Sequence, residues 1–181
     1  AIWYDYSPGQ SDVFFAKSID GGKTFSVQNL SNDLKASYNP WIDSVKNNVY
    51  VVWNDGGKSQ ELEILGEKRI VDVLFGDMEI YFARSDDFGK TFEIKNISNT
   101  EGDSINARLR VDESKVFVVW TENAISNSNI YFSKSENYGL NFTAPINISN
   151  SLENSYDSGI ALQESNVYVI WKESYENQTD I

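Results

Sequence analysis

The chain has 181 residues, of which 40% are hydrophobic and 14% aromatic, and its formal net charge is −12. This length and apolar content predict a folded domain with a sizeable core, and the acidic balance argues against a nucleic-acid partner. The sequence contains no Cys and no His, which excludes disulfides, thiolate chemistry and histidine-based catalysis or metal binding. We therefore expect neither a metal nor a cofactor, and no apolar run is long enough for a membrane span.

Tryptophans at regular intervals mark an internal repeat. Each closes a short apolar run, and the four are Trp3, Trp53, Trp120 and Trp171. They are separated by 50, 67 and 51 residues, so the unit is about 50 residues long and the second interval carries an insertion. A Ser stands 16 residues before each of the last three tryptophans, at Ser37, Ser104 and Ser155. Such constant inner spacing indicates a repeat architecture.

Each unit is predicted to form four β-strands. In chain order, one strand follows the repeated Ser (39–45), the next ends at Trp (49–53), and the third precedes a recurring octapeptide (80–84) that the fourth strand follows. The strand at 49–53 has five consecutive apolar residues, which predicts burial on both of its faces. Four-stranded sheets stacked around an axis provide that burial. We therefore predict an all-β fold, a β-propeller segment of about three four-stranded antiparallel blades.

The insertion occupies residues 57–77, between the second and third strands of its unit. Two strand-like halves around Gly66 predict an added hairpin. This hairpin is either a lid or partner-docking arm, or an insertion that the fold tolerates and that has no function. The chain begins within a second strand and stops as a third strand begins, and about three blades do not close a ring. We predict that 1–181 is a single propeller region within a larger propeller; the alternative is self-association of copies through exposed terminal blades.

The recurring octapeptide reads SIDGGKTF at 18–25, SDDFGKTF at 85–92 and SENYGLNF at 135–142. It joins the third strand to the fourth, so its Asp is expected to accept turn amides, its Gly to adopt positive φ, and its Phe to turn inward and anchor the hairpin. The third copy has Asn in place of Asp, a change that a turn tolerates and a catalytic carboxylate does not. We assign a structural role to Ser18, Asp20, Gly22, Thr24, Phe25, Ser85, Asp87, Gly89, Thr91, Phe92, Ser135, Asn137, Gly139 and Phe142.

The pattern S-x-D-x-G-x-T-F resembles the Asp-box (BNR) repeat of sialidases and their non-enzymatic relatives, the neuraminidase superfamily. Together with the recurring Trp-bearing strands, the resemblance covers essentially the whole chain. It implies a sialidase-like propeller that is secreted or displayed at a cell surface, with the Asp boxes on the face away from the active site. The fold is better defined by this resemblance than the function is.

Sialidase chemistry does not transfer readily to this sequence. The resemblance implies an active site with an arginine triad, a Tyr nucleophile paired to Glu, and an Asp acid/base. This chain has four arginines, which are Arg69, Arg84, Arg108 and Arg110. Arg108 and Arg110 come from one strand, and the F/Y-R-I-P motif that usually supplies the first arginine is absent. We therefore assign no catalytic residue.

Two positions are candidates for ligand binding. Trp41 and Arg108 each lie four residues after a repeated Ser, as does Gly159, near the start of a first strand. That end of the blades, which also carries the insertion, is where propellers usually bind ligands. Trp41 could stack on a sugar and Arg108 could bind a carboxylate. The alternatives are packing of Trp41 against a neighbouring blade and a solvated strand-end charge at Arg108.

Three functional hypotheses therefore remain open. The first is a non-catalytic, exported module that binds a glycan or a cell-surface protein. The second is a fragment of a sialidase-like glycoside hydrolase whose catalytic residues lie mostly outside the chain, and the third is a structural surface-layer or adhesion repeat. The N-x-S/T sequons are compatible with an extracellular location, and they begin at Asn29, Asn96, Asn141, Asn147 and Asn177.

Overall fold

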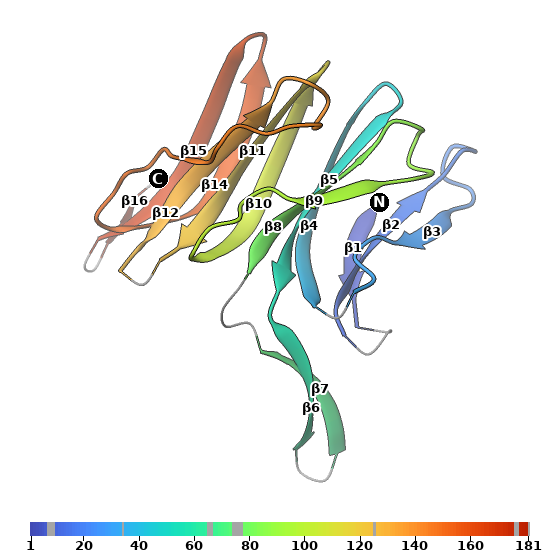
Figure 1. The fold of residues 1–181 in the computed structure, drawn as a ribbon, viewed down its shortest axis with the longest axis horizontal. Coiled ribbons are helices and arrows are strands. Elements are labelled where there is room, and N and C mark those ends of the chain that lie inside the picture. Colours follow the sequence, from blue (N-terminus) through green and yellow to red (C-terminus); the bar gives the residue numbers. More distant parts are fainter. Residues whose placement is uncertain are drawn as a thin grey trace.

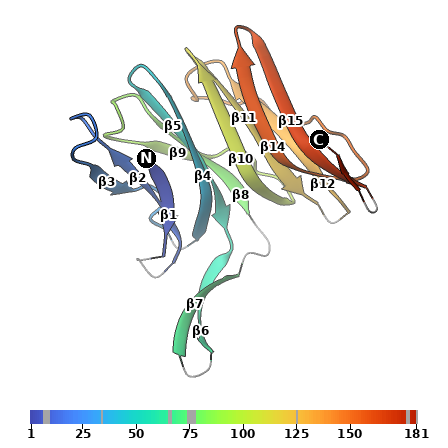
Figure 2. The same ribbon diagram turned by 180° about the vertical axis from the view of Figure 1, so that it is seen from behind.

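The computed structural model describes residues 1–6, 10–33, 35–64, 67–73, 78–124, 126–175 and 178–180. These residues form strands, turns and irregular segments, and none of them is helical. Four antiparallel sheets follow one another along the chain like propeller blades, and a two-stranded ribbon leaves them (Figure 1, Figure 2). The predicted all-β fold of antiparallel blades is confirmed. No helix able to cross a membrane by its length and apolar character occurs in the described ranges.

The strands are distributed over the four sheets in chain order. The first sheet contains β1 (Ile2–Asp5), β2 (Asp12–Lys17) and β3 (Ser26–Asn29). The second contains β4 (Ala36–Val45), β5 (Asn48–Gly56), β8 (Glu79–Ser85) and β9 (Glu93–Asn96). The third contains β10 (Asp103–Asp112), β11 (Lys115–Asn123), β12 (Ser128–Ser135) and β13 (Ile146–Asn147). The fourth contains β14 (Asn154–Gln163), β15 (Asn166–Tyr175) and β16 (Gln178–Asp180).

The order of strands within a sheet follows the order along the chain. In the second and third sheets the Trp-bearing strands β5 and β11 are second, each paired with the first strand on one side and the third on the other. They belong to separate sheets, as expected for separate blades. In the first sheet β1 takes this second place, and its described neighbour is β2 alone.

The ribbon consists of β6 (Lys58–Ile64) and β7 (Glu67–Val73), which pair antiparallel where the sequence predicts the added hairpin. The tip residue Gly66 lies outside the described residues. Figure 1 shows the ribbon leaving the sheets at the end opposite the tight β4–β5, β10–β11 and β14–β15 turns. We call these two ends the ribbon end and the turn end.

Burial on both faces explains the continuous apolar runs. Along β5, Tyr50 and Val52 are buried against the third sheet, where Leu109 belongs to the same cluster. The alternate residues Val51 and Trp53 are buried against the first sheet. The second blade is therefore covered by a neighbour on both sides, and successive side chains on β5 contribute to different cores.

A buried hydrogen-bond network links Ser to the Trp-bearing strand in the second and third sheets. Ser104 Oγ donates to Glu122 Oε2 at 2.6 Å, and the Trp120 indole N–H donates to the same oxygen at 3.1 Å. In the second sheet Asp55 Oδ1 accepts from Ser37 Oγ at 2.8 Å. Ser and carboxylate are cross-strand partners, and Trp lies two residues before the carboxylate. The acidic residue that pairs with Ser across the strands was not predicted from the sequence.

Replacing Asp55 with Asn tests what the buried charge does. Burial raises the pKa of the Asp55 carboxyl. The hydrogen bond from Ser37 and the charge of Lys35, whose Nζ is 3.8 Å from Oδ2, both oppose this shift. A raised folded-state pKa means that this group's contribution to stability is lost as pH rises through that pKa. Asn keeps the acceptor for Ser37 without the charge. We expect Asp55→Asn to be more stable than the parent chain at pH 7, with the difference vanishing near pH 4, in urea unfolding. The exposed Asp112→Asn is the control, and a less stable Asp55→Asn at pH 7 contradicts the expectation.

The octapeptide turns are held by the acceptors that the sequence analysis expects. Asp87 Oδ1 accepts the amides of Lys90 at 2.9 Å and Thr91 at 3.0 Å, and Oδ2 accepts the Thr91 hydroxyl at 2.7 Å. Asp20 makes the equivalent three bonds in the first copy. In the third copy Asn137 Oδ1 still accepts one amide, from Asn141 at 3.0 Å. The glycine at the fifth position of each octapeptide has positive φ: Gly22 at 88°, Gly89 at 71° and Gly139 at 79°.

The octapeptide Phe packs differently from the expectation. Phe142 lies edge-on to Phe82 of the preceding sheet at 4.9 Å between ring centroids, and Phe92 lies edge-on to Phe15 at 5.2 Å. The Phe therefore anchors its hairpin to the neighbouring blade rather than to its own sheet. The prediction for Phe25 is wrong, since it is 55% exposed. No described sheet lies on the side where Phe25 would find such a partner.

Three of the sequons form a repeated turn. Ser98 Oγ accepts the amide of Ile80 at 2.8 Å, and Asn96 Oδ1 accepts the amide of Asn99 at 3.1 Å. Equivalent bonds occur at the tripeptides that begin at Asn29 and Asn147. Asn177 lies outside the described residues. The recurrence of N-x-S at one repeat position is thus explained by the turn that it builds.

Candidate functional site

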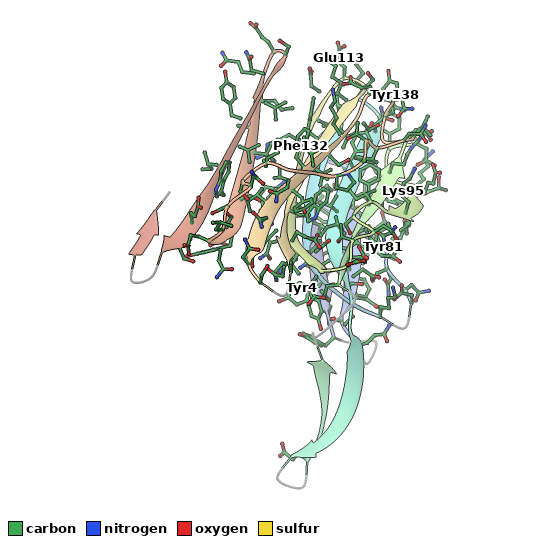
Figure 3. All side chains as sticks on the ribbon, turned by 60° about the vertical axis from the view of Figure 1, so that its left-hand side comes forward. Tyr4, Tyr81, Lys95, Glu113, Phe132 and Tyr138 are labelled. Carbon is green, nitrogen blue, oxygen red and sulfur yellow. The ribbon has the colours of Figure 1, made fainter. Side chains whose placement is uncertain are left out.

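The two ends of the sheets carry different features. The octapeptide hairpins pack on the tight turns of their own sheets at the turn end, where Phe88 donates its amide to Asn47 O at 2.9 Å and Tyr138 donates to Ser114 O at 2.6 Å. Figure 3 places Glu113 and Tyr138 at this end and Tyr4 at the ribbon end. The octapeptides are therefore remote from the ribbon end, where the sequence analysis places binding.

A β-bulge recurs in the innermost strands β4, β10 and β14. The register shifts between Tyr38 and Trp41, between Ile105 and Arg108, and between Tyr156 and Gly159. Each bulge contains a residue with positive φ: Asn39 at 48°, Asn106 at 57° and Asp157 at 52°. Asn and Asp adopt this conformation more readily than other non-glycine residues. The bulges determine where the side chains that follow them are placed, and this was not predicted.

Hydrogen bonds across the blade boundary hold two of these bulges together. Asn39 Nδ2 donates to Asn106 Oδ1 at 3.0 Å, and the Asn106 amide donates to Asn54 Oδ1 at 2.9 Å. Farther along the same strands, the Val111 amide donates to Asp43 Oδ2 at 3.2 Å. The innermost strands of the second and third sheets therefore form one continuous wall.

The structure brings the two candidate binding residues together on this wall. The Arg108 guanidinium carbon lies over the Trp41 ring at 4.6 Å from its centroid, and Arg110 lies over the same ring at 5.6 Å. Trp41 also packs against the core between the second and third sheets, so the packing alternative holds for part of its surface. An arginine–tryptophan stack of this kind contributes about 0.5–2 kcal/mol. Gly159, at the equivalent position of the fourth sheet, brings no side chain to this contact.

The charge on this wall is not neutralised by the described residues. Arg108 Nη1 donates to the carbonyl of Ala107 at 2.9 Å, and Arg110 Nη1 donates to that of Leu109 at 3.0 Å. Within the described ranges neither guanidinium forms an ion pair, whereas Arg84 at the turn end pairs with Asp86. Burial lowers the pKa of Arg108, and the negative charge of Asp157 opposes this shift. Two half-buried arginines that form no ion pair with a described residue are unusual in a chain with a net charge of −12.

An open hollow of about 410 Å³ lies beside the stack. Its walls are β1, through Ile2, Trp3 and Tyr4, and the bulge segments that carry Trp41 and Arg108. We call it the arginine hollow. It offers aromatic surface, two amides and one cation within reach of a single small ligand.

A second hollow of about 510 Å³ adjoins the first towards the ribbon end. It shares Tyr4, Asn39 and Asn106 with the arginine hollow and adds Tyr6 and Tyr38, and we call it the tyrosine hollow. Sequence reasoning missed it because tyrosines are common in β proteins and these come from different sheets. The signal available beforehand was the Asn or Asp that stands two residues before each of Trp41, Arg108 and Gly159, because this residue forms the bulge.

Comparison with known proteins finds similar solved structures. No protein-family model matches the chain, and no curated protein matches it. Two solved structures of Trypanosoma rangeli sialidase are similar, one in complex with the inhibitor DANA at 10% identity and one in complex with sialic acid at 9% identity. Both have a TM-score of 0.32 and match 94% of this chain, which spans about half of theirs, 49% and 48%.

Proposed function

We propose that the chain is a non-catalytic, exported β-propeller module that binds a glycan at the arginine hollow. The observation that carries the proposal is the stack of Arg108 and Arg110 on Trp41, because it combines an aromatic wall with positive charge that forms no ion pair with a described residue. Sugars are bound in proteins by aromatic faces and by a few oriented polar groups. The bulge amides of Asn39 and Asn106, which are hydrogen-bonded to each other, supply such groups in the same hollow.

The absence of catalysis is part of the proposal. Most glycoside hydrolases use two carboxyl groups that flank the scissile bond, and sialidases use a Tyr nucleophile together with an acidic residue as acid/base. The described residues that line the arginine hollow include no Asp or Glu. Export is supported only by the resemblance of the octapeptide, and is tested by locating the native protein in the cell envelope or the medium.

A glycan array of neutral and acidic sugars tests binding, followed by calorimetry on the sugars that bind. Arg108→Ala is expected to weaken binding at least about tenfold, because a charge-assisted hydrogen bond contributes about 1.5–3 kcal/mol. Arg84→Ala removes the same charge at the turn end and is expected to leave affinity unchanged. If no sugar binds, or if both variants weaken binding equally, the proposal fails. Turnover of a fluorogenic sialoside that Arg108→Ala abolishes would show that the chain is catalytic.

A further inference from the structure

The arginine hollow and the tyrosine hollow share one wall but differ in charge. Tyr4, Asn39 and Asn106 line both hollows, so a ligand bound in one hollow can extend into the other. Arg108 lines only the first. The described residues that line the second include no Lys or Arg, and they include the carboxylate of Asp103. An anionic group is therefore favoured in one hollow and disfavoured in the other.

The tyrosine hollow presents aromatic rings that solvent can reach. Tyr4 is 42% exposed and Tyr6 is 50% exposed. Tyr4 stands edge-on to Tyr38 at 5.6 Å and 70°, and to Tyr6 at 6.2 Å and 72°. The three rings thus form an angled wall rather than a flat patch. The C–H face of a pyranose ring suits such a wall, and its hydroxyl groups need polar partners around it.

Those polar partners are held in place by the fold. Asn54 Oδ1 accepts the Asn106 amide at 2.9 Å, and Asn123 Oδ1 accepts the Ser128 hydroxyl at 2.7 Å. Asp103 Oδ1 accepts the Met78 amide at 3.0 Å. Side chains fixed in this way lose little conformational entropy when a ligand binds.

We propose that the tyrosine hollow is a second subsite, for an uncharged sugar ring. The ligand is then an acidic oligosaccharide whose acid group lies at Arg108 and whose neighbouring residue is a neutral hexose or N-acetylhexosamine over Tyr4 and Tyr6. This inference rests on the proposed function and extends it, because it specifies the smallest ligand that fills the site. It also gives a role in ligand recognition to the tyrosines, which are not part of the octapeptide or of the repeat pattern.

Two classes of probe separate the subsites. Methyl β-glucuronide and methyl α-galacturonide carry an acid group and fit the arginine hollow alone, whereas uronate-containing disaccharides extend into the tyrosine hollow. Calorimetry is expected to give affinities about tenfold higher for at least one disaccharide than for its methyl uronoside, which corresponds to one stacked ring. Tyr6→Ala is expected to remove this gain and to leave methyl uronoside binding unchanged. Tyr168→Ala, which removes an equally exposed ring (51%) on the fourth sheet, is the control.

The outcomes distinguish this inference from the proposed function. Equal affinity for methyl uronosides and every disaccharide overturns the second subsite and leaves the arginine hollow intact. An equal loss of both probes in Tyr6→Ala also overturns it, since the tyrosine would then only support the fold. Binding of neither class, together with an empty glycan array, overturns both proposals.

Discussion

Asp87→Ala is expected to lower the Tm of the chain by on the order of 5 °C while leaving ligand binding unchanged. The carboxylate accepts two backbone amides and the Thr91 hydroxyl at the turn end, and Ala leaves these donors without their acceptor. The candidate site lies among the bulges and towards the ribbon end, so affinity has no reason to change. Thermal unfolding and calorimetry on the same preparation check both parts. An unchanged Tm with loss of a bound ligand would show that the octapeptide is itself a functional site.

Asp87→Asn separates the acceptor from the charge. We expect it to be much milder than Asp87→Ala, because Asn137 already fills this position and accepts the Asn141 amide at 3.0 Å. Hydrogen bonds from Thr91, and then from Ser85, hold the pKa of the Asp87 carboxyl well below its usual range. A lowered folded-state pKa stabilises the fold above the unfolded value near 4, and this contribution is lost as pH falls towards the folded value. The difference between parent and Asp87→Asn should therefore shrink from pH 7 to pH 3.

Gly139→Ala is expected to cost about 3 kcal/mol of unfolding free energy, against about 1 kcal/mol for Gly22→Ala. Both glycines have positive φ, at 79° and 88°, so both substitutions strain the backbone. A Cβ on Gly139 would lie 2.5 Å from Phe82 Cζ, whereas the nearest atom to a Cβ on Gly22 is Phe25 Cζ at 4.0 Å. The matched pair thus isolates the steric term in urea unfolding.

A second substitution tests the source of that cost. Phe82→Leu shortens the side chain that meets Gly139, so the double variant is expected to lose less stability than the sum of the two single variants. Additive losses, or equal losses in Gly139→Ala and Gly22→Ala, would show that backbone strain alone accounts for the glycine. Gly89, whose Cβ would lie 2.8 Å from Phe15 Cζ, provides an independent repeat of the experiment.

The sequence predicted features that depend on local patterns. Strand order, the Trp-bearing second strands, the added ribbon and the acceptor role of Asp87 all follow from residue types at short range. The bulges were missed because a register shift is a property of two paired strands. The packing of Phe142 on Phe82 was missed because the partner comes from the previous repeat. In the site, the pattern placed Trp41 and Arg108 at equivalent positions, but only the fold shows that their side chains stack.

The contact between Phe82 and Gly139 also sets a direction for assembly. The ring belongs to β8 and the glycine that receives it lies 57 residues later, and Phe15 and Gly89 repeat the arrangement one blade earlier. During synthesis from the N-terminus, each ring is therefore available before the hairpin that closes over it. Each completed blade acts as a template for the next, so the blades are expected to form in chain order, and an error in one blade passes to the blade that follows it.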